Sequence, residues 1–292
     1  MEEILKKVSK IDYYINWYTT QVCPGSWFSV YKGGGLEFDK ISRYDLGENP
    51  RWINWAATAR IGGQHILKNT YIEERELYLI LVVDLSKSME FGSERVSKRR
   101  LAAEIAATLA YSAWRVGDPI GLIGYTVKIE IHLKPQRQKA YNFLIPQNVL
   151  SFQTQHGTQG KVSSVFESLP AKRALVFWLS DFLEELAEIK KALKVMGSRH
   201  DVIPVVLHDP RERELPQYRG GLRLRDLETG MERMLWFTKK NRATFHAEAK
   251  KREEDLNSLF KQLNLDYLWI DPKTDYLLEI TKLFLSRRRR RS

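Results

Sequence analysis

The segment Leu77–Met89 constrains the fold of this chain more than any other part of the sequence. Seven apolar residues, Leu77 to Val83, run directly into Asp84-Leu85-Ser86-Lys87-Ser88. A short apolar run that is rich in β-branched residues and stops abruptly at polar ones is typical of a buried central strand in a parallel sheet. Ligands of open α/β sheets bind at the carboxyl ends of the strands, so an Asp and two Ser hydroxyls are expected where a ligand site forms.

These three side chains allow two interpretations. Carboxylate and hydroxyl oxygens are hard donors that suit Mg²⁺ or Mn²⁺ and not zinc. Asp and Ser are also common caps at the start of a helix. On this segment alone, a metal site and a helix cap are equally compatible with Asp84 and Ser86.

Strands and helices alternate beyond residue 77. Continuous apolar runs predict strands, and apolar residues three and four apart predict helices. The strands are expected at 77–83, 120–125, 129–133, 174–179, 202–207 and 267–270, and the helices at 96–116, 161–168, 183–195, 242–263 and 274–285. This alternation predicts an α/β fold built on a doubly wound, mostly parallel sheet.

Two additions to this sheet are expected. Residues 1–76 combine a predicted helix over 1–20 with short aromatic strands such as Trp27–Tyr31 and glycine-rich turns, so they form a β-rich N-terminal preamble. A β-hairpin is expected as an insertion at about 219–238. The sequence thus divides into the preamble, a main domain over 77–286 and a basic tail over 287–292.

Polar side chains follow a second apolar strand and one loop in the same way. The strand Ala174–Leu179 stops at Ser180-Asp181, and Gly157-Thr158 lies in a polar loop just before a predicted helix. In a parallel sheet these loops open on one edge. Two carboxylates and three hydroxyls match a small divalent cation that keeps some of its water. The predicted donors are Asp84, Ser86, Ser88, Thr158 and Asp181.

Composition bounds the compartment and the partners. The chain of 292 residues has one cysteine, Cys23, which cannot form an internal disulfide framework, and no secretory signal or stretch approaching 18 apolar residues is visible. We therefore expect a cytoplasmic protein with no membrane span. The net charge is +11, and the tail supplies five of these charges, from Arg287, Arg288, Arg289, Arg290 and Arg291. Such a tail either contacts phosphates of nucleic acid or of anionic lipid, or is simply solvated and disordered.

The pattern Asp84-x-Ser86-x-Ser88, then Thr158, then Asp181, resembles the metal-ion-dependent adhesion site of von Willebrand factor type A domains. Upstream, Gly35–Phe38, Gly47–Arg51 and Thr58–Arg60 add to the likeness. Together with the segments around Asp209-Pro210 and Asp226–Gly230, they resemble the bacterial and archaeal domain-of-unknown-function family 58 over residues 24 to 285. One departure is Asn49, where that family usually has Asp; it lies outside the metal motif.

This resemblance implies a function. The hydroxyls would contact Mg²⁺ or Mn²⁺ directly or through water, Asp84 and Asp181 would hold coordinated waters, and an open position would accept an acidic residue of a partner protein. The family further implies a non-enzymatic adaptor for a MoxR-type AAA+ ATPase, acting in chaperone-like maturation or assembly. The alternative is a nucleic-acid-binding protein that uses the basic tail.

Other chemistries fit less well. A phosphatase with an aspartyl nucleophile needs a second Asp two residues after Asp84, where this chain has Ser86. The nearest stretch to a phosphate-binding loop, Gly157–Val162, has the wrong spacing and lacks the final Ser/Thr. A metal-dependent hydrolase lacks a convincing general base. His208 and Asp209 follow another strand and are candidates for lining the same crevice.

Overall fold

The structure is a computed structural model that describes residues 37–45, 48–72, 78–94, 96–153, 162–214, 221–225, 232–236 and 238–291. The helix predicted over 1–20, the strand Trp27–Tyr31 and the predicted metal donor Thr158 lie outside these ranges. The described residues fall into two compact units, one over residues 37–72 and the other from residue 78 onward.

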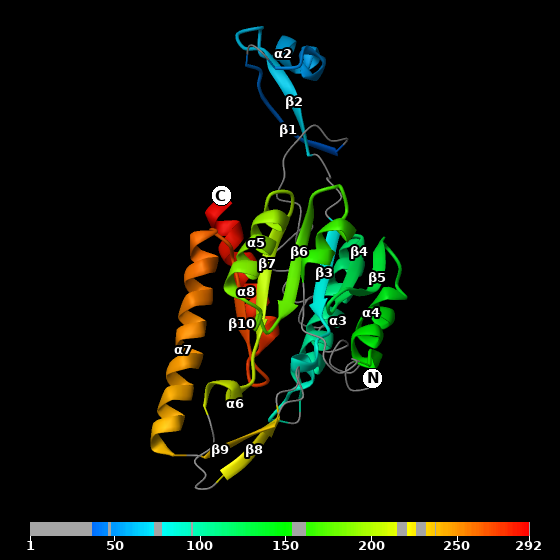
Figure 1. Cartoon of the computed structure of the whole chain (residues 1–292). Helices are drawn as coiled ribbons and strands as arrows, with labels where there is room; N and C mark the ends of the chain where they lie inside the picture. The colour runs from blue at the N-terminus through cyan, green and yellow to red at the C-terminus, as the bar shows by residue number, and fades with distance from the viewer. Residues whose placement is uncertain are drawn as a thin grey trace. The chain divides into compact units, whose positions relative to one another are not determined.

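The smaller unit is a hairpin with a short helix (Figure 1). Strands β1 (Glu37–Arg43) and β2 (Leu67–Ile72) pair antiparallel, and helix α2 (Trp55–Arg60) follows a 3-10 turn at Pro50–Trp52. Thr58 ties the helix to the hairpin, because its hydroxyl donates to the Asn54 carbonyl and accepts from Leu67 N, both at 2.9 Å.

The larger unit is built on a six-stranded sheet in the order β10-β7-β6-β3-β4-β5. All neighbouring pairs are parallel except β4 and β5. The strands are β3 (Tyr78–Asp84), β4 (Ile120–Tyr125), β5 (Ile129–Gln136), β6 (Ala174–Ser180), β7 (Asp201–Leu207) and β10 (Leu268–Ile270). The predicted α/β fold with a doubly wound, mostly parallel sheet is therefore confirmed.

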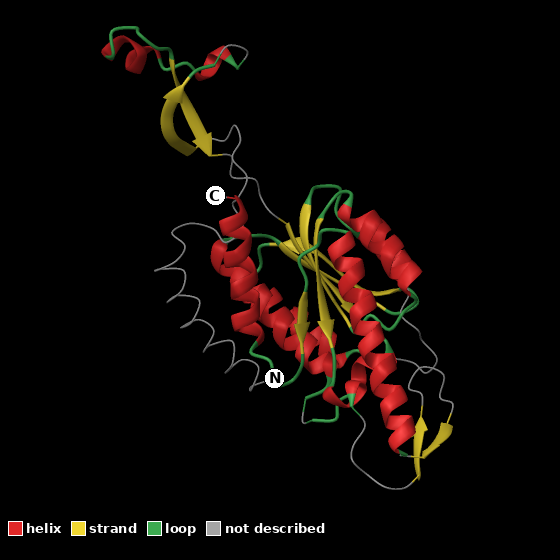
Figure 2. Ribbon diagram, turned by 90° about the vertical axis from the view of Figure 1, so that its left-hand side faces the viewer, coloured by secondary structure: helices red, strands yellow, loops and turns green. Residues whose placement is uncertain are grey.

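Helices cover both faces of this sheet (Figure 2). On one face, side chains of α5 and α7 share a core with Val82, Val176 and Trp178. Phe177 lies between Val176 and Trp178 in β6, so its side chain points to the other face, where it packs on Phe284 of α8. The helices are α3 (Lys98–Val116), α4 (Tyr141–Ser151), α5 (Leu186–Gly197), α6 (Pro210–Arg213), α7 (Lys239–Gln262) and α8 (Tyr276–Arg291). Two 3-10 helices lie at Lys87–Glu90 and Val162–Ser168.

Three elements refine the sequence prediction. The inserted hairpin is present as β8 (Gly221–Arg225) and β9 (Glu232–Trp236), which pair antiparallel. Helix α4 was not predicted, because Pro146 lies inside it and proline in a helix interior removes a hydrogen bond. Helix α8 continues to Arg291, beyond the predicted end at residue 285. Within the described ranges, no helix combines the length and the apolar character needed to cross a membrane.

The order of the strands locates the site. The chain passes from β3 outward through β4 and β5, and then returns to build β6, β7 and β10 on the other side of β3. The order of connection thus reverses between β3 and β6, which pair directly from Tyr78 to Val83. In doubly wound sheets the ligand crevice lies outside the carboxyl ends of the two strands at such a reversal. Asp84 and Asp181 come from these two strand ends.

Candidate metal centre

Asp84 is fixed in one orientation at the end of β3. It is almost completely buried, with 2% of its surface exposed. Its Oδ1 accepts a hydrogen bond from Ser86 N and its Oδ2 accepts one from Ser180 Oγ, both at 2.8 Å. Burial, together with the charge of Asp181, raises the pKa of Asp84 from 3.8 to about 6. A cation nearby would therefore stabilise the charged form of this carboxyl group.

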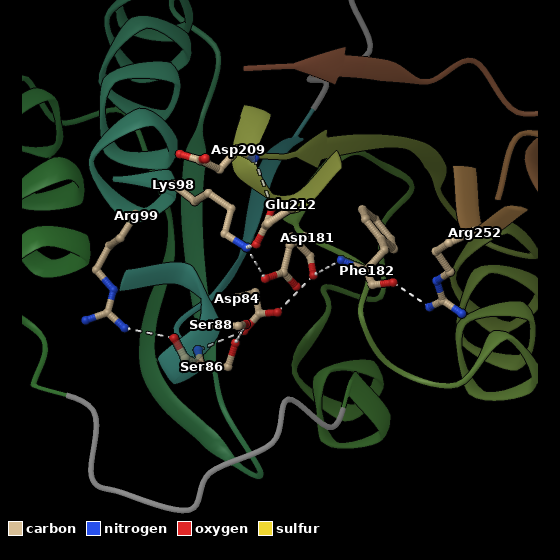
Figure 3. Close-up of polar contacts among 11 residues, drawn as sticks. Asp84, Ser86, Ser88, Lys98, Arg99, Asp181, Phe182, Asp209, Glu212 and Arg252 are labelled. Atoms are coloured by element: carbon tan, nitrogen blue, oxygen red, sulfur yellow. Dashed lines mark hydrogen bonds and ion pairs between the residues drawn. The ribbon is translucent and has the colours of Figure 1, made fainter. Parts of the chain in front are cut away.

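The two serines place a pair of hydroxyls beside that carboxylate (Figure 3). Ser86 precedes the 3-10 helix Lys87–Glu90, but its side chain makes no capping hydrogen bond. Instead, Ser86 Oγ lies 3.0 Å from Ser88 Oγ, and both residues are buried. The helix-cap interpretation of Ser86 is therefore not what the structure shows, and the two hydroxyls remain as neighbouring oxygen donors.

Asp181, directly after β6, faces a buried lysine. Lys98, the first residue of α3, has no exposed surface, and its ammonium donates to Asp181 Oδ2 at 2.7 Å and also to Glu212 of α6. Burial alone would lower the pKa of Lys98, but the charges of Asp181 and Glu212 raise it overall. Figure 3 shows the lysine between the two carboxylates. Its charge offsets part of the negative charge at the site.

The next residue, Arg99, holds the backbone of the loop that follows β3. Its Nη2 donates to the carbonyls of Leu85 at 2.8 Å and Ser86 at 3.1 Å, and its Nη1 donates to the Phe152 carbonyl at 2.8 Å. Adjacent residues at the start of α3 therefore hold the two sides of the site: Arg99 the loop after β3, and Lys98 the carboxylate after β6.

These residues fit a small, hard divalent cation. Asp84, Ser86, Ser88 and Asp181 offer only oxygen atoms, and a hydroxyl pair 3.0 Å apart lies next to a carboxylate whose charge is unfavourable in its buried surroundings. In the part of the chain that the structure describes, no three His, Cys, Asp or Glu side chains are placed to hold a metal ion. The candidate site therefore depends on hydroxyls, and its predicted fifth donor, Thr158, lies outside the described residues.

The two candidates for lining the crevice are occupied by local contacts. Asp209 is fully buried and accepts hydrogen bonds from the backbone N and the hydroxyl of Ser93, while also capping α6 through Arg211 N at 2.8 Å. His208 packs edge-on against Trp269, with ring centroids 5.6 Å apart. Burial, then the charge of Arg213, lowers the pKa of His208 to about 4. The loop after β3 that carries Ser86 and Ser88, with Asp84 at its start, is called the candidate metal loop. Asp209 thus ties Ser93, which follows this loop, to α6.

The first arginine of the basic tail forms internal ion pairs. Arg287 Nη1 and Nη2 donate to the two carboxylate oxygens of Asp201 at 2.9 and 3.0 Å, and its Nε donates to Asp266 at 2.6 Å. This arginine anchors α8 to the sheet. The backbone of α8 continues through Arg288, Arg289, Arg290 and Arg291, whose contact with nucleic acid stays a prediction.

Lys98, Glu212 and Ser180 are residues of the site that the sequence prediction missed. Lys98 had a detectable signal, since it lies in the same helical stripe as Ala102 and Ile105 and therefore had to be buried. Glu212 also had one, because Asp209-x-x-Glu212 has the spacing of a capping box, which the structure contains. Ser180 gave no signal beyond its place beside Asp181.

Comparison with known proteins places the chain in a family. A family model described as "Protein of unknown function DUF58" matches residues 40–255. The chain belongs to this family. It is 27% identical over 273 residues to the uncharacterized proteins Rv1480 of Mycobacterium tuberculosis and Mb1516 of Mycobacterium bovis, covering 92% of this chain and 84% of each relative.

Solved structures with a similar arrangement include an aerotolerance-related membrane protein from Bacteroides fragilis, with a TM-score of 0.46 and 14% identity over 72% of this chain and 99% of that one. Another is the VWA domain of SpRpn10, with a TM-score of 0.37 and 9% identity over 71% of this chain and 94% of that one. The DUF58 family resemblance noted from the sequence is thus confirmed by the family match, which covers the candidate donors.

Proposed function

We propose that this DUF58 protein is a non-enzymatic protein-interaction module that binds Mg²⁺ or Mn²⁺ at Asp84, Ser86, Ser88, Thr158 and Asp181, and through the ion contacts an acidic residue of a partner. The observation that carries the proposal is the all-oxygen cluster at the reversal point of the sheet. There the Ser86 and Ser88 hydroxyls lie 3.0 Å apart beside the buried carboxylate of Asp84. When bound, the cation would supply a positive charge with an open coordination position.

The chain's own residues hold this arrangement. Ser86 N and Ser180 Oγ orient the Asp84 carboxylate, while Arg99 fixes the carbonyls of the loop. Lys98 keeps Asp181 in place by a buried ion pair. Each of these contacts restricts motion and leaves the loop ordered before a partner arrives, which lowers the entropy lost on binding.

The partner class comes from the family resemblance. We propose a MoxR-type AAA+ ATPase as the partner, with this chain as an adaptor in maturation or assembly of other complexes. The contact would be charge-assisted and would depend on the ion, so a chelator is expected to break it.

The first experiment measures the metal directly. Purified chain is titrated with Mn²⁺ and the free ion is followed by electron paramagnetic resonance, with Mg²⁺ as competitor. Asp84→Asn is expected to weaken binding at least tenfold. The matched control is Asp118→Asn. Asp118 is also partly buried, and burial raises its pKa to about 6 as well. It precedes β4 and therefore lies at the opposite edge of the sheet from the candidate site.

The second experiment tests the partner. A tagged chain and its Asp84→Asn variant are incubated with lysate of the native host, with Mg²⁺ and with chelator, and the retained proteins are read by mass spectrometry. An AAA+ ATPase retained only by the unaltered chain with Mg²⁺ supports the proposal. Equal binding of Mn²⁺ by both forms, or recovery of nucleic acid that is indifferent to chelator and weakens steeply with salt, contradicts it.

A further inference from the structure

Two exposed apolar side chains stand on either side of the candidate metal loop. Leu183 is 55% exposed and follows Asp181 by two residues, and Val127 is 44% exposed and follows Tyr125 by two residues. Strand β3 lies between β6 and β4, and Asp84 pairs with Tyr125 across β3 and β4. The two apolar side chains therefore leave the sheet from the strands that flank Asp84, at the same carboxyl edge.

The loop that carries Leu183 is held in a costly conformation. Phe182 has a φ of 52°, in the left-handed region, which costs about 1–2 kcal/mol for a residue with a side chain. Its N donates to Ser180 Oγ at 3.0 Å, and its carbonyl accepts from Arg252 Nη2 at 2.5 Å (Figure 3). The same guanidinium also donates to the carbonyl of Glu184. The backbone is therefore fixed on both sides of Leu183.

The Phe182 ring explains why the conformation persists. It is buried, and its centroid lies 4.7 Å from the Trp178 ring and 5.7 Å from the Phe260 ring. Since one residue of this loop is held inside by two aromatic rings, its neighbour Leu183 is directed outward. Strained backbone that is held by its surroundings occurs mainly at functional sites.

The turn that carries Val127 is also fixed. Thr126 is buried, its N donates to the Lys128 carbonyl at 2.9 Å, and its hydroxyl donates to Glu130 at 2.7 Å. Val127 is the tip of this tight turn, and Lys128 beside it is exposed. An apolar group and a positive charge thus lie on the β4 side of the loop.

We infer that Leu183, Val127 and the metal loop form one docking surface for a short partner segment in which an Asp or Glu is flanked by apolar side chains. This inference rests on the proposed function, because it assigns the acidic residue to the metal position. The apolar side chains of the partner that flank its Asp or Glu would cover Leu183 on one side and Val127 on the other. The positive charge of Lys128 complements the acidic partner segment. Aliphatic side chains offer no stacking surface for bases, so the surface suits a protein segment better than a nucleic acid.

The probe is a displayed library of random heptapeptides with a central Asp, selected on the immobilised full chain with Mg²⁺ and, in parallel, with chelator. A second library with a central Asn reports the need for the acid. We expect Mg²⁺-dependent enrichment from the Asp library only, with Leu, Ile, Met or Phe enriched next to the central residue.

Substitutions of the apolar residues separate peptide binding from metal binding. Leu183→Asn and Val127→Ser are each expected to lower the affinity for a selected synthetic peptide about tenfold, because apolar contact area is lost. The affinity for Mn²⁺ is expected to stay unchanged. Leu278→Asn is the matched control, an exposed leucine on α8 with 44% of its surface accessible. It is expected to leave peptide affinity unchanged.

Four results would overturn the docking surface, two of them while leaving the proposed function intact. Asp-dependent enrichment without neighbouring apolar residues, or equal peptide affinity of Leu183→Asn and Leu278→Asn, overturns the docking surface and leaves the proposed function intact. Absence of any enrichment that depends on both Mg²⁺ and the central Asp overturns the proposed function together with the inference. Reduced Mn²⁺ binding by Leu183→Asn overturns the inference as well, since the substitution would then act through the metal loop.

Discussion

Replacement of Lys98 by methionine is expected to change stability and metal affinity in opposite directions. The ammonium has no exposed surface and lies between Asp181 and Glu212. Methionine keeps an unbranched chain of similar size but leaves both carboxylates without their cation. Breaking a buried ion pair by removing one partner costs about 3–5 kcal/mol, so the free energy of unfolding without metal should fall by about that amount.

The effect on the metal has the opposite sign. At an assumed separation of about 6 Å and an effective dielectric constant of about 20, a unit charge and a divalent cation repel each other by about 5–6 kcal/mol. Removing the charge of Lys98 should therefore tighten Mg²⁺ binding by at least about a hundredfold. Glu212→Gln should have the opposite effect. It removes a negative charge beside the same ammonium and should therefore weaken the binding of Mg²⁺.

The assay combines urea unfolding in chelator with titration of Mn²⁺ followed by electron paramagnetic resonance. The control is Lys282→Met, which removes an exposed ion pair with Glu279 at 2.7 Å and should change stability by less than about 1 kcal/mol. Circular dichroism verifies that the variant is folded at the temperature of the titration. Weaker Mn²⁺ binding by a folded Lys98→Met chain would refute this account of the charge balance.

Three further predictions concern the same unit. Because the folded pKa of Asp84, about 6, lies above its ordinary value of 3.8, this group favours folding most below about pH 4, and its contribution falls as pH rises through 6. Without metal, the free energy of unfolding of the unaltered chain, measured with urea, should thus fall between about pH 4 and pH 7 by up to about 3 kcal/mol more than that of Asp84→Asn, and parallel pH profiles would contradict this. Arg287→Ala should cost about 1–3 kcal/mol in urea unfolding, because the partly buried Asp201 loses its two-bond contact; a loss below about 0.5 kcal/mol would argue against an anchored α8. Tyr125→Phe should cost about 1–3 kcal/mol, since the buried Trp178 Nε1, now 2.8 Å from the phenol oxygen, loses its acceptor; a neutral result would show that a water replaces it.

Much of the fold was accessible from the sequence because apolar runs carry topology directly. Residues Leu79–Val83 and Ala174–Leu179 are buried and belong to adjacent central strands, as the lack of alternation in these apolar runs predicted. The one strand with alternating pattern, Ile129–Leu133, is the antiparallel edge strand β5. Helix α4 was not predicted from the sequence, because Pro146 indicates a break in a helix. In the structure, packing on α3 overrides this local preference.

The site was predictable only in part. The convergence of the polar side chains that follow β3 and β6 was predicted, because the carboxyl edge of a parallel sheet collects such side chains regardless of their distance in sequence; their role as metal donors stays a prediction. Partners contributed by helices were missed, since nothing in the residues around Asp181 indicates that Lys98, 83 positions away, reaches its carboxylate. Backbone contacts such as those of Arg99 to the Leu85 carbonyl carry no sequence signature at all.

The charge balance bears on whether the site would hold an ion for itself or offer it to a partner. Both oxygens of Asp84 already accept hydrogen bonds from Ser86 and Ser180, and Asp181 faces the ammonium of Lys98. Neither carboxylate can therefore give its full charge to a cation. An ion at this site would attract a partner's carboxylate more strongly than an ion held by several carboxylates that make no other contacts. Lys98→Met removes this restraint. We therefore expect the variant to bind Mg²⁺ more tightly but a central-Asp peptide more weakly per bound ion, and equal or tighter peptide binding at saturating Mg²⁺ would contradict that reasoning.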